Sequence, residues 1–252
     1  MVSVFLKPPV LAELLGRSTV VDLRRYPDYR SGHIPNAISI PFHYFISLRG
    51  LALYPPLGED LSRLSMWLSS SKEPIILYDE DDCKNACRAA YILEHLGIDA
   101  RVLEGGFETW RKHGFPVEVD GGHPATHGSR QLSYVKKPID KTDMLKFLKK
   151  GDALIVDTRH PEQYKAARIP SSINVPWYLI FTDDGALKDD WRRVIGTVVN
   201  SFGDARVVTY CDEGMNSTLV MYALRMLGIK AECYLPSFNE WGSDPDLPKE
   251  RG

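Results

Sequence analysis

The sequence predicts an α/β protein built from two copies of one domain, each a mainly parallel sheet flanked by helices. Three observations support this fold class: an internal duplication about 130 residues apart, an alternation of β-branched runs with helical patterns in each half, and a polar, glycine-containing stretch between the halves. The length of 252 residues suits two domains of ordinary size.

The composition is that of a globular protein and identifies no partner by itself. Apolar residues make up 44% and charged residues 25%, and the formal net charge is −2. No block of basic residues stands out, so we expect no nucleic-acid partner. No apolar run reaches the ~18 residues that a membrane helix needs, and the N-terminal residues lack the pattern of a secretory signal. We therefore expect a cytoplasmic protein with no membrane partner.

The duplication is visible in short blocks that recur in the same order. Val-Val-Asp-Leu-Arg at 20–24 returns as Ile-Val-Asp-Thr-Arg at 155–159, and Ile-Ile-Leu-Tyr at 75–78 returns as Val-Val-Thr-Tyr at 207–210. The repeat is much longer than a solenoid unit, so it indicates a duplicated domain. The predicted organisation is one domain over 1–117, a linker over 118–133 and a second domain over 134–252.

Each half carries the same order of predicted elements. Short β-branched runs predict strands, and apolar residues at helical spacing predict helices between them. The predicted strands cover 18–23, 37–40, 74–79 and 100–103, then 153–157, 173–175, 206–210 and 231–235. The predicted helices cover 59–69 and 85–96, then 189–200 and 216–227. Ligands of such sheets bind where strands end and helices begin, which directs attention to the residues after Tyr78 and Tyr210.

Cys211 follows the strand that ends at Tyr210 and opens a short loop containing Gly214. A helix is predicted to begin near Asn216 or Ser217, whose side chains are typical of N-caps. Loop N–H groups and a helix N-terminus stabilise a thiolate, so this is a place where a thiol can be activated. The alternative interpretation is a buried, unreactive cysteine that closes a strand.

The first copy differs from the second at this point, because Asp79 stands where the second copy has Cys211. Such a difference predicts one active and one inactive copy. Cys83 and Cys87 lie in an acidic loop that disfavours their thiolates, and Cys233 lies in an apolar strand, so we expect none of the three to be a nucleophile. Cys83 and Cys87 sit four residues apart, but no second pair of cysteines or histidines has zinc-ribbon spacing, so no metal is expected.

At this point the chain resembles a tandem-domain rhodanese, the family of thiosulfate and 3-mercaptopyruvate sulfurtransferases. The resemblance spans roughly residues 5–245 and rests on the order and duplication of several short motifs. The residues that carry it are Val21–Arg24, Tyr29, Ser31–Ala37, Tyr78–Asp79, Arg88–Tyr91, Glu104–Phe107, Trp110, Cys211–Ser217, Tyr234, Ser237, Glu240 and Trp241.

The resemblance implies a sulfurtransferase that works through a persulfide on Cys211 and needs no organic cofactor. A small anionic donor such as thiosulfate would load the sulfur, and a thiol or cyanide would accept it. The implied substrate-binding residues are those of the loop: Asp212, Glu213, Gly214, Met215, Asn216 and Ser217. Arg168 departs from the family's pattern, because it replaces the histidine of the usual Gly-His-Ile-Pro run, and we expect it to supply a nearby cation for the substrate.

The loop departs from the thiosulfate-specific members of the family, which leaves the donor open. Asp212 and Glu213 place acid where those members have basic residues, and Gln163 stands where two-domain members have a substrate-binding arginine. 3-Mercaptopyruvate is therefore an alternative donor, as is a protein persulfide. A catalytically silent module that binds a partner or senses redox state is another alternative. A phosphatase of the related cell-cycle type is a further alternative. Its chemistry needs an arginine six residues after the cysteine, where this chain has Ser217, so the sequence disfavours it.

Overall fold

The computed structural model describes residues 3–119, 131–183, 185–199 and 205–252, and the chain divides into two compact units. The N-terminal unit comprises Val2–Ser47 and Pro55–Lys137. The C-terminal unit comprises Pro138–Gly252 together with Leu48–Tyr54. Most of the predicted linker, residues 120–130, lies outside the described residues. The predicted domain limits remain a prediction, and the assignment of Leu48–Tyr54 to the C-terminal unit is a feature that they did not include.

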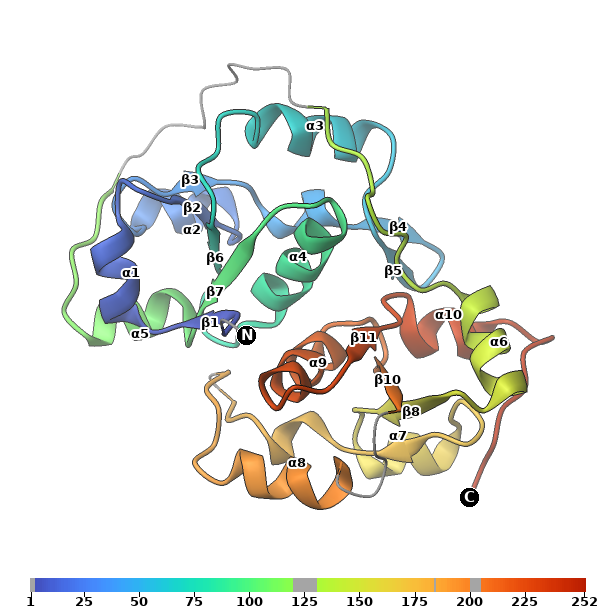
Figure 1. The fold of residues 1–252 in the computed structure, drawn as a ribbon. Helices are drawn as coiled ribbons and strands as arrows, with labels where there is room; N and C mark the ends of the chain where they lie inside the picture. The colour runs from blue at the N-terminus through green and yellow to red at the C-terminus, as the bar shows by residue number, and fades with distance from the viewer. Residues whose placement is uncertain (1–2, 120–130, 184, 200–204) are drawn as a thin grey trace. The chain divides into compact units, whose positions relative to one another are not determined.

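The N-terminal unit contains a five-stranded sheet in the order β1-β7-β6-β2-β3, with every described pairing parallel. Helices lie on both sides of it (Figure 1). Its strands are β1 (Phe5–Leu6), β2 (Thr19–Asp22), β3 (Ile38–Ser39), β6 (Ile75–Tyr78) and β7 (Ala100–Leu103). Its helices are α1 (Pro8–Leu14), α2 (Tyr26–Ser31), α3 (Glu59–Trp67), α4 (Lys84–His95) and α5 (Gly106–Lys112). A 3₁₀ helix, Phe42–Phe45, precedes the two-stranded hairpin of β4 (Ser47–Arg49) and β5 (Ala52–Tyr54).

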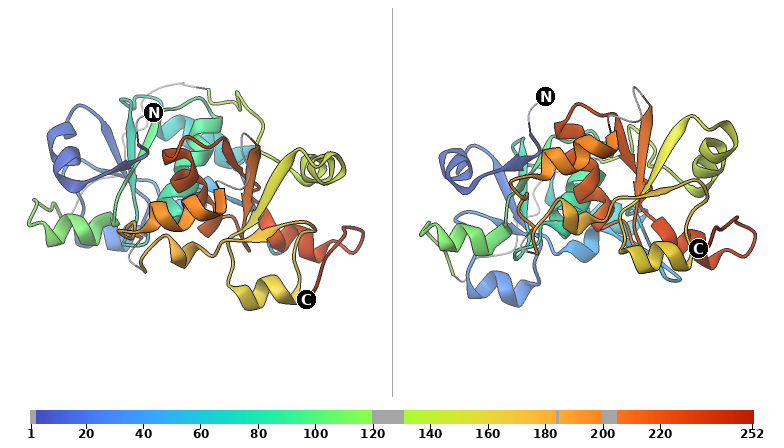
Figure 2. Two further views of the ribbon diagram at one scale, coloured as in Figure 1. Left: turned by 60° about the horizontal axis from the view of Figure 1, so that its bottom comes forward. Right: turned by 90° about the horizontal axis from the view of Figure 1, so that it is seen from below.

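The C-terminal unit repeats this architecture with a four-stranded parallel sheet in the order β11-β10-β8-β9. Its strands are β8 (Ala153–Asp157), β9 (Ile173–Asn174), β10 (Arg206–Tyr210) and β11 (Ala231–Cys233). Its helices are α6 (Lys141–Lys150), α7 (Pro161–Ala166), α8 (Trp191–Val199), α9 (Asn216–Met226) and α10 (Ser237–Ser243), with a 3₁₀ helix at Trp177–Leu179. Figure 2 shows helices on both sides of each sheet. The predicted fold class is therefore confirmed.

Burial explains why the central strands are apolar on both faces. All four residues of β6 are buried, as are Val207–Tyr210 of β10, because helices cover both sides of each sheet. Equivalent aromatic side chains anchor the two cores: Tyr78 and Trp110 in the N-terminal unit, Tyr210 and Trp241 in the C-terminal unit. This packing fixes the carboxyl ends of β6 and β10, where the two loops that follow them begin.

Local sequence determines where the helices begin and end. Asp140 accepts a hydrogen bond from the Asp143 N–H and forms a capping box at the start of α6, and Gly151 ends that helix in the left-handed conformation. Proline in the first turn starts α2 and α7, which are only six residues long. Helices this short give little apolar periodicity, so the sequence did not predict them.

Candidate active site

Cys211 lies where the central strand β10 ends, and its side chain is 2% exposed. The five residues Cys211–Met215 form a loop before α9 begins at Asn216. The carboxyl end of a parallel strand is the usual ligand position in an α/β sheet. The sequence placed the candidate nucleophile at this point, and the structure puts it there.

Two donors point at the sulfur of Cys211. The Gly214 N–H donates to Sγ at 3.1 Å, and the Ser217 hydroxyl donates to it at 3.5 Å. Gly214 has a φ of +80°, a left-handed conformation that turns its N–H back toward the cysteine at no steric cost. Both donors stabilise negative charge on the sulfur, as an attacking thiolate requires.

The start of α10 holds the backbone of the loop in place. The Cys211 N–H donates to the Ser237 hydroxyl at 3.2 Å, and that hydroxyl donates to the Tyr234 carbonyl at 2.8 Å. The Phe238 N–H donates to the Cys211 carbonyl and the Asn239 N–H to the Asp212 carbonyl, both at 2.9 Å. The N–H and C=O groups of Cys211 are therefore both anchored to one short helix.

Ser237 occupies the position that Gly106 holds in the first copy. The equivalence shows in the hydrogen bonds of the next residue. The Phe238 N–H, after Ser237, donates to the Cys211 carbonyl, and the Phe107 N–H, after Gly106, donates to the Asp79 carbonyl. Both residues are left-handed, with φ +55° at Ser237 and +56° at Gly106. A Cβ added to Gly106 would come within 2.7 Å of two carbonyl oxygens. The C-terminal unit thus holds a serine in a conformation that favours glycine, and gains from it the hydroxyl that binds the Cys211 N–H.

Asp212 is held by two side chains of the C-terminal unit. Gln163 donates from Nε2 to its carboxylate at 3.0 Å, and a guanidinium nitrogen of Arg159 lies 3.7 Å from it. Arg159 is itself buried against Asp157 and stacks on the Phe238 ring at 4.0 Å. Its positive charge partly compensates the acid that the sequence placed in this loop.

The remaining predicted loop residues have distinct surroundings. Glu213 is exposed, and its carboxylate accepts a hydrogen bond from the Asn239 side chain at 3.3 Å. The Met215 carbonyl accepts a hydrogen bond from the Thr218 hydroxyl. The Asn216 Oδ1 atom is buried, with no hydrogen-bond donor among the residues that the structure describes.

The predicted helix cap is wrong, although the predicted start of the helix is confirmed. Residue Met215 holds the N-cap position of α9 and makes no side-chain cap. Ser217 cannot cap the helix because its hydroxyl is directed at sulfur: it lies 3.5 Å from Cys211 Sγ and 3.2 Å from Cys233 Sγ. The side chain that the sequence marked as a cap is therefore a neighbour of the reactive atom.

Arg168 makes contacts other than those expected of a substrate-binding cation. Its guanidinium donates to the Gly252 carbonyl at 2.8 Å, lies 3.3 Å from the Glu250 carboxylate and stacks over Tyr164. None of its described hydrogen bonds or ion pairs reaches the Cys211 loop. The structure thus joins the loop residues into one site and gives Arg168 a place in the packing of the C-terminal segment.

Asp79 takes the place of the nucleophile in the N-terminal unit and fills the loop with its own carboxyl group. Its two oxygens accept the N–H groups of Cys83 and Ala86, each at 3.1 Å. Burial, with a contribution from Asp82, raises the pKa of Asp79 to about 7. In the other copy one amide, that of Gly214, binds the thiol sulfur, whereas two amides of the first copy bind a side-chain carboxyl group.

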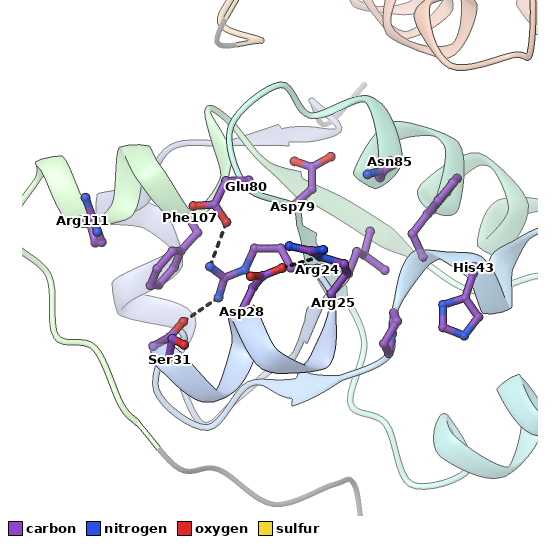
Figure 3. A pocket seen from close by; sticks show the side chains of 14 residues that line it. Arg24, Arg25, Asp28, Ser31, His43, Asp79, Glu80, Asn85, Phe107 and Arg111 are labelled. Atoms are coloured by element: carbon purple, nitrogen blue, oxygen red, sulfur yellow. Dashed lines mark hydrogen bonds and ion pairs between the residues drawn. The ribbon is translucent and has the colours of Figure 1, made fainter.

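A cavity of about 710 Å³ opens beside this loop, at the carboxyl ends of β2 and β6 (Figure 3). Its three arginines are already in ion pairs: Arg24 with Asp22 and Glu80, Arg25 with Asp28, and Arg111 with Glu108. In Figure 3 the Asp79 carboxyl group points away from the Arg24 guanidinium. The cavity therefore offers little uncompensated positive charge to an anionic sulfur donor.

The other cysteines are buried free thiols. Burial, followed by the nearby Asp79, raises the pKa of Cys83 well above its usual value, and burial also raises that of Cys87. The expectation that their thiolates are disfavoured is confirmed. Cys233 is fully buried on β11.

The same buried pair of charged side chains recurs in both units. Arg24 binds Asp22 and Arg159 binds Asp157 through their Nε and terminal nitrogens, with both carboxylates fully buried. The Tyr78 hydroxyl donates to Asp22 at 2.6 Å. Because the pair occurs in both copies, it supports the strand ends in each.

Two parts of the site were not predicted from the sequence. Asn239 bridges the loop through its side chain, and the hairpin β4–β5 supplies the Leu51 carbonyl that the same amide binds at 2.9 Å. The hairpin lies within the predicted first domain along the chain, and no local pattern in it points to the second.

Among the described residues, no group of three or more histidine, cysteine or acidic side chains is placed to hold a metal ion. No described helix is long and apolar enough to cross a membrane.

Comparison with known proteins agrees with the geometry. The chain is 27% identical over 245 residues to a putative thiosulfate sulfurtransferase, SseB, of Mycobacterium tuberculosis, covering 89% of this chain and 85% of the relative. It is 25% identical to the 3-mercaptopyruvate sulfurtransferase of Escherichia coli, covering 88% of this chain and 85% of that protein. The crystal structure of SseA from Escherichia coli matches with a TM-score of 0.79 at 23% identity, over 94% of this chain and 99% of that one.

The family assignment rests on both halves of the chain. The model of the rhodanese-like domain matches residues 7–113 and again residues 140–244. These two matches cover the two loops described above and, apart from β1 (Phe5–Leu6), the strands of the two sheets. The chain therefore belongs to the rhodanese-like domain family and contains two copies of that domain.

Proposed function

We propose that this protein is a sulfurtransferase that carries sulfane sulfur on Cys211, with thiosulfate as donor and a thiol or cyanide as acceptor. The observation that carries the proposal is the pair of donors at the sulfur: the Gly214 N–H at 3.1 Å and the Ser217 hydroxyl at 3.5 Å. The names of the sequence relatives, which include both thiosulfate and 3-mercaptopyruvate sulfurtransferases, support it.

In the first step the Cys211 thiolate attacks the outer sulfur of thiosulfate. A bond forms between Sγ and that sulfur, the sulfur–sulfur bond of thiosulfate breaks, and sulfite leaves with the electron pair. The product is a persulfide on Cys211 that carries one negative charge. The donors at Gly214 and Ser217 stabilise the thiolate before this step, and the anchored backbone of Cys211 keeps the sulfur in position.

In the second step the acceptor attacks the outer sulfur of the persulfide. Cyanide leaves as thiocyanate, or a thiolate leaves as a new persulfide, and the bond to Sγ breaks in either case. Its electron pair returns to Cys211 as the thiolate that began the cycle. No organic cofactor enters these steps, and we propose that the N-terminal unit does no sulfur chemistry, because Asp79 replaces the nucleophile.

3-Mercaptopyruvate is the second candidate donor. The acidic loop favours it over thiosulfate, because it carries less negative charge. Asp212 and Glu213 repel a dianion more strongly than a monoanion, and Arg159 compensates only the first of them. Attack on the sulfur of 3-mercaptopyruvate would release the enolate of pyruvate, which then takes up a proton.

The four buried free thiols suit a reducing compartment, and we propose the cytoplasm as the place of action.

A steady-state assay with cyanide as acceptor tests the proposal. We expect thiocyanate to form from thiosulfate, from 3-mercaptopyruvate or from both, and to disappear in Cys211→Ala. The larger kcat/KM identifies the donor. A folded, reduced enzyme that forms no thiocyanate from either donor, or a Cys211→Ala variant that retains the activity, contradicts it.

A further inference from the structure

Two side-chain hydrogen bonds within the C-terminal unit hold the hairpin β4–β5 on α10, the helix that anchors the catalytic loop Cys211–Met215: Tyr54 binds Glu240, and Asn239 binds the Leu51 carbonyl. The Tyr54 hydroxyl donates to one oxygen of Glu240 on α10 at 2.8 Å, and Tyr234 donates to the other. Burial and the bond to Glu240 raise the pKa of Tyr54 to about 12, so its hydroxyl remains a donor at neutral pH. This shared carboxylate fixes one strand of the hairpin on α10.

Asn239 connects the tip of the hairpin directly to the loop. Its side-chain nitrogen donates to the Leu51 carbonyl at 2.9 Å and to the Glu213 carboxylate at 3.3 Å. Its backbone N–H donates to the Asp212 carbonyl, next to Cys211. One residue of α10 thus holds the hairpin tip and the two acidic loop residues together.

The fixed hairpin presents apolar side chains to solvent beside this loop. Leu51 is 73% exposed and Leu48 is 68% exposed. Single exposed leucines are ordinary on a protein surface. Here two of them lie on one hairpin whose tip shares a hydrogen-bonding nitrogen with the catalytic loop. Their burial against a partner would be favourable, because it removes apolar surface from water.

The charge next to these leucines is acidic on the side of the loop, whereas the hairpin itself carries the exposed Arg49. Asp212 is 41% exposed at its side chain, and Glu213 is exposed. Arg49, also on the hairpin, lies over the Tyr54 ring at 5.1 Å. On the side of the loop this surface of leucines is bordered by carboxylates, and that side is complementary to a partner with apolar and basic side chains.

We propose that Leu48, Leu51, Asp212 and Glu213 form a docking surface for a protein sulfur acceptor whose reactive cysteine is flanked by apolar and basic side chains. This inference rests on the proposed function, since it names the acceptor of the Cys211 persulfide. A small donor needs only the donors around Sγ, whereas the outer face of the loop and the hairpin serve the second step.

The transfer is balanced without any further reagent. The acceptor cysteine loses its proton to solvent, and its thiolate attacks the outer sulfur of the Cys211 persulfide. A new sulfur–sulfur bond forms on the acceptor while the bond to Cys211 Sγ breaks. The Cys211 thiolate leaves with the electron pair, and the acceptor carries the persulfide away.

Transfer to synthetic peptides tests the surface on the full chain. The enzyme is loaded with thiosulfate or 3-mercaptopyruvate, and the gain of one sulfur is recorded by intact mass. Loaded enzyme is then mixed with a peptide that has one cysteine between leucine and lysine residues, with a matched peptide in which serine and glutamate replace them, or with dithiothreitol. The readout is kcat/KM for each peptide divided by that for dithiothreitol.

We expect the leucine–lysine peptide to be preferred over the serine–glutamate peptide by about tenfold or more. In Leu48→Ser/Leu51→Ser this ratio falls by about tenfold, equivalent to ~1.4 kcal/mol of lost burial. Leu145→Ser on α6, whose leucine is 39% exposed, is the matched control and keeps the ratio of the unaltered chain.

Two results would overturn the docking surface. One is equal transfer to the two peptides by the unaltered chain, and the other is an unchanged ratio in the double variant. A failure of both donors to load Cys211 is a separate result, because it removes the proposed function itself and the acceptor step with it.

Discussion

The backbone N–H of Cys211 donates to the side-chain hydroxyl of Ser237 at 3.2 Å, across 26 positions of sequence. The same hydroxyl donates to the Tyr234 carbonyl, so Ser237 joins the end of β11 to the end of β10. Ser237 reaches this position with a φ of +55°. The first copy has Gly106 there and no hydroxyl, and its loop bears no candidate nucleophile. Ser237 is therefore a positioning residue for the loop that carries the sulfur.

Two replacements of Ser237 separate the effect of its hydroxyl from the effect of its left-handed backbone. Ser237→Ala removes the hydroxyl but keeps the left-handed strain, so we expect the free energy of unfolding to fall by about 1–3 kcal/mol, because the buried Cys211 N–H loses its acceptor. Ser237→Gly also loses the acceptor but regains about 1 kcal/mol from the backbone. Glycine should therefore be the more stable variant in urea unfolding.

Both Ser237 variants should load sulfur on Cys211 more slowly, since the loop loses an anchor. Ser243→Ala, at the other end of α10, removes an exposed hydroxyl and serves as the control with unchanged loading. A Ser237→Ala enzyme with the stability and loading rate of the unaltered chain contradicts the positioning role.

The buried pair of Arg159 and Asp157 makes a second prediction. Asp157 is fully buried and receives the Nε and terminal N–H groups of Arg159. Arg159→Met leaves an unpaired carboxylate in the core, and we expect a loss of about 3–5 kcal/mol in the free energy of unfolding. Arg193→Met breaks an exposed pair with Asp190 and should cost at most about 1 kcal/mol. Chemical denaturation measures both losses. If Arg159→Met lowers the free energy of unfolding no more than Arg193→Met does, the buried pair does not stabilise the fold as predicted.

The raised pKa of Asp79 predicts a pH dependence of stability. The folded protein keeps this proton up to about pH 7, whereas the unfolded chain releases it near the ordinary value of 3.8. Between these values the folded state binds more protons than the unfolded state, so this group lowers stability as pH rises, by roughly 1.4 kcal/mol per pH unit. Above about pH 7 its contribution becomes constant.

Asp79→Asn removes this titration, so its stability relative to the unaltered chain should rise from pH 4 to about 7 and then level off. Urea denaturation of both proteins at several pH values measures the difference. Two stability curves that stay parallel over this range would mean that Asp79 is not a buried acid with a raised pKa.

The negative charge of Glu213 predicts how kcat/KM depends on the charge of the sulfur donor. Glu213→Gln keeps the hydrogen-bonding shape that Asn239 binds and removes one negative charge beside the loop. We expect kcat/KM for thiosulfate to rise about fivefold at low salt, equivalent to ~1 kcal/mol, with a smaller rise for the monoanionic 3-mercaptopyruvate. The gain should shrink as ionic strength increases.

Glu59→Gln, at an exposed position of α3, provides the control for the Glu213 substitution. Stopped-flow measurement of persulfide formation with each donor compares the two variants. Gains that are equal for a dianion and a monoanion, or that persist at high salt, would exclude charge repulsion as the reason.

The sequence predicted the features that recur in both copies. Strand ends at Tyr78 and Tyr210 follow from local apolar runs, and the exchange of Asp79 for Cys211 becomes visible once the copies are aligned. The position of the candidate nucleophile depends on this local pattern and on the comparison of the two copies, and both are contained in the sequence.

The features that were missed depend on contacts distant in sequence or on unusual backbone. Tyr54 binds Glu240 across 186 positions, and no periodicity marks such a pairing. The left-handed turn at Ser237 was hidden because the residue there is not glycine. Ser217 has the composition of a helix cap, yet tertiary contact with two sulfur atoms determines where its hydroxyl points.

Intact-mass analysis of the reduced protein after incubation with thiosulfate, and separately with 3-mercaptopyruvate, tests the central claim most directly. The account predicts a gain of one sulfur atom that cyanide removes and that is absent from Cys211→Ser. A folded protein that gains no sulfur from either donor, or a Cys211→Ser variant that gains it like the unaltered chain, would contradict the account.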